Sequence, residues 1–154
     1  MTYNRKWLGV LVVILTMVSC EQGDEMYQYQ EVGSWSKEES IDFEFDVVAD
    51  SDIQPVLTIE HSRDFRFENI YLLISYTINN VDAFSDTMSL QLADDSGYWI
   101  GDCQAEYCSV TSKTPSTIRN SGGRPVDINV NQFSRLDTVH GIHGLGVKLV
   151  QINQ

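Results

Sequence analysis

The protein has 154 residues, of which 42% are hydrophobic, and its formal net charge is −12. This length allows one domain with a hydrophobic core but not two. The acidic balance excludes nucleic acid as a partner, since binding to phosphates needs clustered Lys and Arg, and it argues against adsorption of the domain to an anionic lipid surface.

The first residues have the pattern of a secretory signal. Arg5 and Lys6 form a short basic segment, and 12 apolar or small residues follow from Trp7 to Val18. A bilayer span takes about 20 apolar residues, so we expect this segment to be cleaved rather than retained as an anchor.

Cys20 directly follows the expected cleavage site. The sequence Met17-Val18-Ser19-Cys20 is similar to a bacterial lipobox, whose cysteine is acylated and becomes the new N-terminus. Acyl chains contribute about 0.8 kcal/mol per buried CH₂, so several of them hold a protein firmly on a membrane. We therefore predict an envelope lipoprotein attached to the membrane through lipid on Cys20. The alternative is an ordinary secreted protein.

Cleavage divides the chain into three predicted parts. Residues 1–19 are the signal peptide, residues 20–33 are the lipidated cysteine and an acidic tether, and residues 34–154 are the folded domain. The tether is polar without apolar periodicity, as expected of a linker. Its residues 22–25 also resemble an acidic signal that exports some lipoproteins to the cell surface, and both interpretations stay open.

Cys103 and Cys108 remain once Cys20 is assigned to lipid. Disulfides persist in an oxidising compartment, and the four intervening residues allow the turn that a disulfide requires. We predict a Cys103–Cys108 disulfide that fixes a local loop. A metal or redox pair is disfavoured, because there is no second pair and no C-x-x-C spacing.

From residue 41 onward, the hydrophobic pattern has a period of two, which predicts half-buried strands. We expect strands at residues 41–47 and 56–59, the latter beginning after Pro55, which has no N–H to donate. Residues 70–78 are apolar on both faces, which predicts a central strand. One of these faces carries Ile70, Leu72, Ile74, Tyr76 and Ile78.

Later strands are expected at residues 88–92, 98–100, 126–130 and 145–149. Residues 94–97 predict a tight hairpin turn in which glycine supplies the positive φ. The Ser-, Thr-, Asn- and Gly-rich residues 111–124 are expected to be loop, with a helical turn only near residues 132–136. About seven short strands separated by turns predict an all-β fold, a single antiparallel β-sandwich.

The sequence has no nucleophile elbow, phosphate-binding glycine loop or zinc-protease motif. His140 and His143 offer two metal ligands, but no spacing supplies a third. Asp94, Asp95 and Asp102 lack the alternating spacing of a calcium loop. We expect no metal site, no cofactor and no enzymatic activity.

Trp35, Tyr98 and Trp99 are the candidates for an exposed interaction surface. Large aromatic residues of a small sandwich often belong to the core. Strand alternation, however, places Trp99 opposite Tyr98 and Ile100, so one of these two faces meets solvent. Such a surface could stack on sugar rings or contact a protein.

Several segments in a fixed order resemble the GldH family of gliding-motility lipoproteins from Bacteroidetes. The resemblance runs over residues 27–150, and it is carried by residues 35–37, 41–45, 69–77, 86–87, 92–94, 97–101, 132–136, 141–142 and 144–149. The Cys103–Cys108 loop and the stretch after it are less typical of the family. The resemblance implies an outer-membrane lipoprotein needed for gliding and linked to the type IX secretion machinery, and it brings no catalytic residues.

These observations together predict a non-enzymatic, lipid-anchored lipoprotein of the outer membrane, on its periplasmic or its surface face. We expect it to act as an accessory or assembly component of the gliding and type IX secretion machinery, with other envelope proteins as partners. The alternative is a surface lipoprotein that binds glycans for nutrient capture through Trp35, Tyr98 or Trp99.

Overall fold

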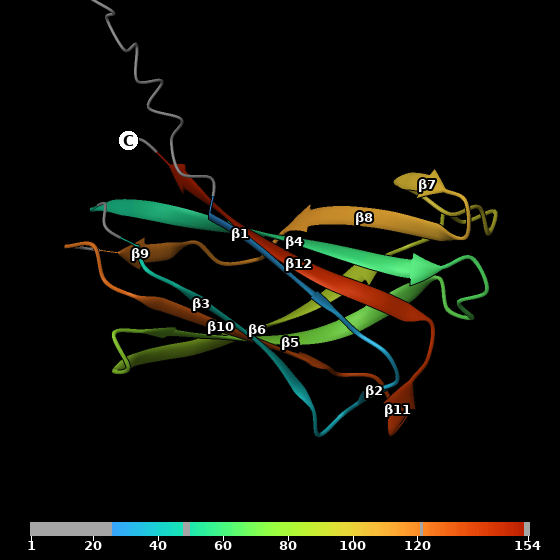
Figure 1. Cartoon of the computed structure of the whole chain (residues 1–154), viewed down its shortest axis with the longest axis horizontal. Helices are drawn as coiled ribbons and strands as arrows, with labels where there is room; N and C mark the ends of the chain where they lie inside the picture. Colours follow the sequence, from blue (N-terminus) through green and yellow to red (C-terminus); the bar gives the residue numbers. More distant parts are fainter. Residues whose placement is uncertain (1–25, 48–49, 121, 153–154) are drawn as a thin grey trace, which may run out of the picture.

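The computed structural model describes residues 26–47, 50–120 and 122–152, and these form an all-β fold without a helix (Figure 1). The predicted signal peptide and lipid site at Cys20 lie outside the described residues. Within the described ranges, no helix has the length and apolar character needed to cross a membrane.

The larger sheet has the strand order β1-β12-β4-β8-β7, and β9 pairs with β4 after β8 ends. All of its pairings are antiparallel. The longest is between β12 and β4, whose register shifts once, between Ile142 and Gly144. The strands of the larger sheet are β1 Met26–Glu31, β4 Ser51–Ser62, β7 Asp102–Gln104, β8 Tyr107–Lys113, β9 Ile118–Asn120 and β12 Ile142–Ile152.

The smaller sheet has the order β3-β10-β5-β6, so β5 is central, as the sequence predicts. Its strands are β3 Ser40–Phe45, β5 Asn69–Ile78, β6 Asp82–Gln91 and β10 Val126–Gln132. A short pair, β2 Trp35–Ser36 and β11 Thr138–Val139, lies at one end. The two main sheets face each other in Figure 1, which confirms the predicted antiparallel β-sandwich.

The core lies between the sheets and follows from strand alternation, because every second side chain points to the same face. The predicted inward face of β5, from Ile70 to Ile78, is buried along its whole length. In β10, Val126, Ile128 and Val130 are buried in the same way. Each large apolar side chain buried here contributes about 1.5–3 kcal/mol.

Polar contacts join the sheets along both open sides of the sandwich. On one side, the amides of Gln28 and Gln30 in β1 donate hydrogen bonds to main-chain carbonyls of β3. On the other side, the carboxylate of Asp86 in β6 accepts hydrogen bonds from the backbone N–H and the hydroxyl of Ser116, both at 3.0 Å. The edges of the two sheets are therefore fixed relative to each other.

The sandwich has two distinct ends (Figure 1). At the end that we call the anchor end, Met26 pairs with Leu149 in the larger sheet, and the smaller sheet has its β5–β6 turn at residues 79–81. The opposite end, the loop end, carries the connections at residues 63–68, 92–101 and 133–141. Residue 26, where the described chain begins, thus lies far from most of the long connections.

The predicted tether over residues 20–33 is too long, because residues 26–31 form β1 along β12. The pattern of β1 is unusual. Tyr27 and Tyr29 cover the outer face of the larger sheet above glycines of β12, while Gln28 and Gln30 turn toward β3. An edge strand with polar residues on its inner side has no apolar period, so it resembles a linker in sequence.

Four other local predictions also differ from the structure. Residues 98–100 form no strand, because Trp99 makes only an isolated bridge with Ala93. Residues 111–124 are not all loop, because the hydroxyls of Thr58 and Thr111 pair at 2.8 Å across β4 and β8, and Ile118 is buried in β9. Pro55 lies within β4 rather than before it. The carbonyl of Pro55 accepts the N–H of Thr114. The nitrogen of Pro55, which has no hydrogen to donate, therefore lies on the side of β4 where the neighbouring strand changes from β8 to β9. Residues 132–136 form no helical turn.

Candidate functional site

The predicted surface of Trp35, Tyr98 and Trp99 is only partly correct. Trp35 is fully buried in β2, opposite Val139 of β11. Its indole N–H donates to the carbonyl of Glu39 at 3.0 Å. An indole whose single donor is satisfied can be buried without penalty, so Trp35 belongs to the core and not to a surface.

The hairpin at residues 94–97 forms as predicted. The carboxylate of Asp94 accepts the N–H groups of Ser96 and Tyr98, both at 2.9 Å, and Gly97 has a φ of 80°. The hairpin base is fixed by Glu68, whose carbonyl accepts the N–H groups of Leu92 and Ala93. The turn therefore extends from a rigid base at the loop end.

Tyr98 and Trp99 have different environments on this hairpin. The side chain of Tyr98 is 73% exposed, whereas Trp99 is half-buried against the core. The ring of Trp99 meets the ring of His61 edge-on, with centroids 4.7 Å apart. Of the three predicted surface residues, Tyr98 is exposed, Trp99 supports the hairpin and Trp35 is internal.

His61 is a fully buried imidazole near the end of β4. Its Nδ1 lies 2.9 Å from the carbonyl oxygen of Ser62, so Nδ1–H is the donor, and Nε2 has no hydrogen-bond partner among the described residues. Burial lowers the pKa of His61, which keeps the ring neutral. This ring therefore serves as a packing element between Trp99 and Phe65.

The aromatic contacts continue from His61 to a groove that sequence reasoning missed. Phe65 contacts His61 at 5.7 Å between centroids and Phe67 at 5.5 Å. Beyond Phe67 lies a cavity of about 640 Å³ at the loop end, which we call the aromatic groove. Its exposed apolar side chains are Phe67, Tyr71, Phe133 and Leu136, and its further lining comes from Phe65, Asn69, Ile70, Ser134, Arg135 and Val139.

The exposure of these side chains is unusual for their size. Phe133 is 59% exposed and Tyr71 is 50% exposed, on a molecule whose other large apolar residues are mostly buried. Exposed apolar clusters on a soluble surface often mark binding sites. The sequence held one signal: Tyr71 and Phe133 fall out of phase with the buried faces of β5 and β10.

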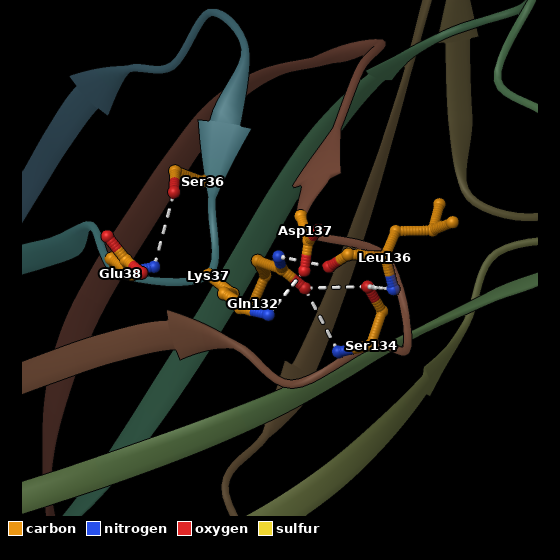
Figure 2. Close-up of polar contacts among 7 residues, drawn as sticks. All are labelled: Ser36, Lys37, Glu38, Gln132, Ser134, Leu136 and Asp137. Carbon is orange, nitrogen blue, oxygen red and sulfur yellow. Dashed lines mark hydrogen bonds and ion pairs between the residues drawn. The ribbon is translucent and has the colours of Figure 1, made fainter.

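The loop that carries Phe133 and Leu136 is held by one buried side chain, that of Gln132 (Figure 2). The Oε1 atom of Gln132 accepts the N–H of Ser134 at 3.0 Å and its hydroxyl at 2.6 Å. The amide of Gln132 donates to the carbonyl of Leu136 at 3.1 Å. A single glutamine thus satisfies both ends of the loop and fixes the shape of the groove.

A second restraint on the same loop is the ion pair between Lys37 and Asp137. It joins the loop to the turn after β2 and lowers the pKa of Asp137, chiefly through the hydrogen bond between the two side chains. Both side chains are exposed, so water and salt screen the pair and it adds little to stability. Arg135, in contrast, is exposed at the groove and has no ion-pair partner among the described residues.

The histidines and acidic residues considered as ligands are dispersed. His140 Nδ1 lies 2.9 Å from the Ser34 hydroxyl, while His143 stacks on Tyr107 with centroids 4.3 Å apart. Asp94 holds the hairpin turn, as described above. Among the described residues, no group of three or more His, Cys, Asp or Glu side chains is arranged to hold a metal ion.

Cys103 and Cys108 are joined by a disulfide in the structure. They are direct cross-strand partners of β7 and β8, with Cα atoms 4.0 Å apart. Cys108 also pairs across β4 with His61. The bond therefore fastens the short strand β7, at the loop end, beside the aromatic contacts of His61.

Comparison with solved structures finds distant likenesses. One is to part of a family GH115 4-O-methyl-α-glucuronidase with specificity for decorated arabinogalactans, at 9% identity and a TM-score of 0.43, covering 82% of this chain and 14% of that chain. Another is to part of dimeric latent PorU from Porphyromonas gingivalis, at 15% identity and a TM-score of 0.35, covering 82% and 12%. TM-scores below 0.5 are too low to assign a function to this chain from these structures.

Comparison of sequences is more informative. A curated relative, the "Gliding motility lipoprotein GldH homolog" of Christiangramia forsetii, is 23% identical over 101 residues, which are 63% of this chain and 62% of the length of that protein. A sequence model of the GldH lipoprotein family matches residues 24–149, nearly the whole sandwich. The chain therefore belongs to the GldH lipoprotein family, membrane-anchored lipoproteins of the cell envelope that are related to gliding motility.

Proposed function

We propose that this lipoprotein is a non-enzymatic contact component of the gliding and type IX secretion machinery at the outer membrane, attached through lipid on Cys20. The observation that carries the proposal is the aromatic groove at the loop end. Its exposed aromatic side chains and its arginine are the residue types that are enriched at the centres of protein interfaces. Membership of the GldH lipoprotein family, which is related to gliding motility, supports the motility part of this proposal.

Capture of glycans is the weaker account of the same fold. It depended on a platform of Trp35, Tyr98 and Trp99, yet Trp35 is internal and Trp99 is half-buried. Tyr98 alone remains as an exposed ring on the hairpin, which does not make a platform. The aromatic groove offers a mainly apolar surface instead.

Motility and secretion assays in cells test this proposal directly. We expect deletion of the gene to reduce colony spreading and adhesin secretion, and the wild-type gene to restore both. Phe133→Ser should fail to restore them, because it removes an exposed apolar side chain of the groove. Val81→Ser is the matched control, since Val81 is 76% exposed but lies in the β5–β6 turn at the anchor end.

Both variants must reach wild-type abundance in the membrane fraction and keep the wild-type melting temperature. Tyr98→Ser in the same assay shows whether the hairpin takes part in the contact. A deletion strain that spreads and secretes normally would reject the motility function and leave glycan capture as the better account.

A further inference from the structure

The length of chain between lipid and domain limits how the sandwich is oriented. If Cys20 carries the lipid, only six peptide steps separate it from Met26, and an extended chain covers about 20 Å over that distance. Met26 is fixed at the anchor end by its pairing with Leu149. The anchor end is therefore kept close to the membrane.

The loop end projects away from the membrane under the same restraint. β4 has 12 residues and runs from the anchor end to the loop end, a length of roughly 40 Å at about 3.3 Å per residue. The acidic chain also disfavours lying flat on anionic lipid. The aromatic groove is thus presented to other envelope components and not to the lipid beneath the domain.

The chemistry of the groove selects its occupant. Phe67, Tyr71, Phe133 and Leu136 offer apolar contact, and Arg135 adds one guanidinium without an ion-pair partner among the described residues. Arg135 is one of few cationic residues on an acidic chain, because after signal cleavage the chain would keep 8 basic side chains against 22 acidic ones. A guanidinium binds a carboxylate through two parallel hydrogen bonds, and such charge-assisted bonds are stronger than neutral ones.

We propose that the aromatic groove binds an extended segment of a partner protein in which a bulky apolar side chain is followed or preceded by a carboxylate. The apolar side chain packs against Phe133 and Tyr71, and the carboxylate pairs with Arg135. This inference rests on the contact function proposed above and adds the class of partner.

The aromatic groove is preorganised, because its shape is fixed before a ligand binds. Gln132 holds the loop from both sides, and the Lys37–Asp137 pair holds it from the turn after β2 (Figure 2). A loop that is already ordered loses little conformational entropy on binding. Phe133 and Leu136 therefore keep their exposed positions in the absence of a partner.

A peptide selection tests the chemistry. The full lipidated chain, in phosphatidylcholine vesicles, is screened against a phage-displayed library of random heptapeptides, with protein-free vesicles as the background. We expect enriched peptides to carry Phe, Leu or Trp beside Asp or Glu. The strongest is then synthesised with a fluorophore, and its binding is measured by anisotropy.

The variants separate the two parts of the groove. Phe133→Ser should weaken binding of this peptide at least tenfold, and Val81→Ser should leave it unchanged. Arg135→Glu should also weaken binding, and a peptide with Lys in place of its acidic residue should restore it. Any of three results overturns the proposal: no enrichment above background, enrichment of peptides without a carboxylate, or binding that Phe133→Ser leaves unchanged.

The lipid bilayer is the other possible occupant, and a second measurement distinguishes it. An environment-sensitive fluorophore is placed on Phe133→Cys or on Val81→Cys in vesicles that contain nitroxide-labelled lipid. We expect stronger quenching at position 81 than at position 133. The reverse result would place the groove on the membrane and overturn the proposal.

These outcomes are independent of the cellular assay. Normal motility and secretion in a deletion strain would reject the proposed function. This result would not contradict a selected peptide whose binding depends on the aromatic groove. A deletion strain that fails to glide, together with no peptide that depends on Phe133, would reject the partner class alone.

Discussion

The ring of Tyr29 lies directly over Gly144: a Cβ built on Gly144 would fall 1.8 Å from the hydroxyl oxygen of Tyr29 and 2.1 Å from its Cζ. The tyrosine hydroxyl donates to Glu60 Oε2 at 2.9 Å, which fixes the ring in this position. Tyr27 covers Gly146 in the same way, two residues along β12. The glycines of β12 thus make room for aromatic side chains that fasten β1 to the sheet.

Gly144→Ala should therefore destabilise the domain. The new methyl group displaces the Tyr29 ring and breaks its hydrogen bond to Glu60, so we expect the free energy of unfolding to fall by about 1–2 kcal/mol. Urea denaturation gives this value. Gly33→Ala is the control, because nothing lies within 4 Å of the added atom there, and it should be neutral or slightly stabilising.

A double variant shows whether Tyr29 is the cause. Removing the ring in Tyr29→Ala should make Gly144→Ala nearly neutral in that background. Equal losses from Gly144→Ala with and without the ring would mean that the glycine serves another purpose.

His61 predicts a loss of stability on mild acidification. Burial lowers its pKa in the folded state, whereas the unfolded chain binds the proton at about pH 6.5. The unfolded state therefore holds more protons below this pH, so the stabilisation is complete above it and is lost as the pH falls toward the folded-state pKa, by at most about 1.4 kcal/mol per pH unit. Urea midpoints between pH 8 and pH 5 measure the effect.

His61→Phe supplies the comparison, since it keeps an aromatic ring between Trp99 and Phe65 but does not titrate there. Its stability should depend less on pH over this range. Parallel pH profiles for the two proteins would contradict a neutral, buried His61.

Ile74→Asp should prevent folding. Ile74 is fully buried in β5, and its direct cross-strand partner is Asp86 of β6, so the change places two carboxylates opposite each other inside the sandwich. We expect a loss above about 4 kcal/mol and no cooperative thermal transition by circular dichroism. Ile74→Val should cost only about 0.5–1.5 kcal/mol. A cooperative Ile74→Asp protein that melts near wild type would show that this residue does not face the core.

Loss of the Cys103–Cys108 disulfide should have a small global effect. The cysteines are only 5 positions apart, so the bond restricts little of the unfolded chain, and replacing both by alanine should cost less than about 2 kcal/mol. We expect faster amide hydrogen exchange in β7 and β8 and unchanged exchange in β5. Peptide mapping without reductant that finds two free thiols in the native protein would contradict the bond itself.

Cys20→Ala should abolish acylation, because it removes the only thiol that the predicted lipobox offers. Metabolic labelling with a palmitate analogue should mark the wild-type protein and not the variant, which should be released from membranes or left unprocessed. Equal labelling of both proteins would reject Cys20 as the lipid site.

The sequence predicted the strands whose two faces differ sharply. In β3 and β10, large apolar residues alternate with polar ones, and burial follows this alternation closely. The turn at residues 94–97 was equally predictable, because Asp94 and Gly97 satisfy requirements that lie within the turn itself. Local chemistry sufficed at these positions.

β1 and β9 could not be predicted in this way, because their stability comes from partners distant in sequence. Gln28 and Gln30 look like linker residues until β3 supplies the carbonyls that they bind. Trp35 became internal for a similar reason, since β11 closes over it about a hundred residues later in the chain. A polar or aromatic residue alone does not reveal which surface will cover it.

The aromatic groove was outside the reach of sequence patterns for the same reason. Phe67 follows β4, Tyr71 lies on β5, and Phe133 and Leu136 follow β10, so no spacing joins them. Only the antiparallel pairing of β10 with β5, which sets the Phe133 N–H 2.7 Å from the Tyr71 carbonyl, brings them together. A single sequence shows each as an isolated apolar residue out of phase.

The direction of β1 has a mechanical consequence for a protein held between a lipid and a partner. β1 enters the sheet at the anchor end and lies antiparallel to β12, with six residue pairs from Met26–Leu149 to Glu31–Gly144. A partner that pulls on the loop end while the lipid holds Met26 loads this ladder along the strand axis. All of its hydrogen bonds then resist the force together in shear, rather than opening one after another, and the side-chain bonds of Gln28 and Gln30 to β3 share the load. The attachment of β1 to the sheet is therefore strongest against a pull along the strand axis, from the anchor end away from the loop end.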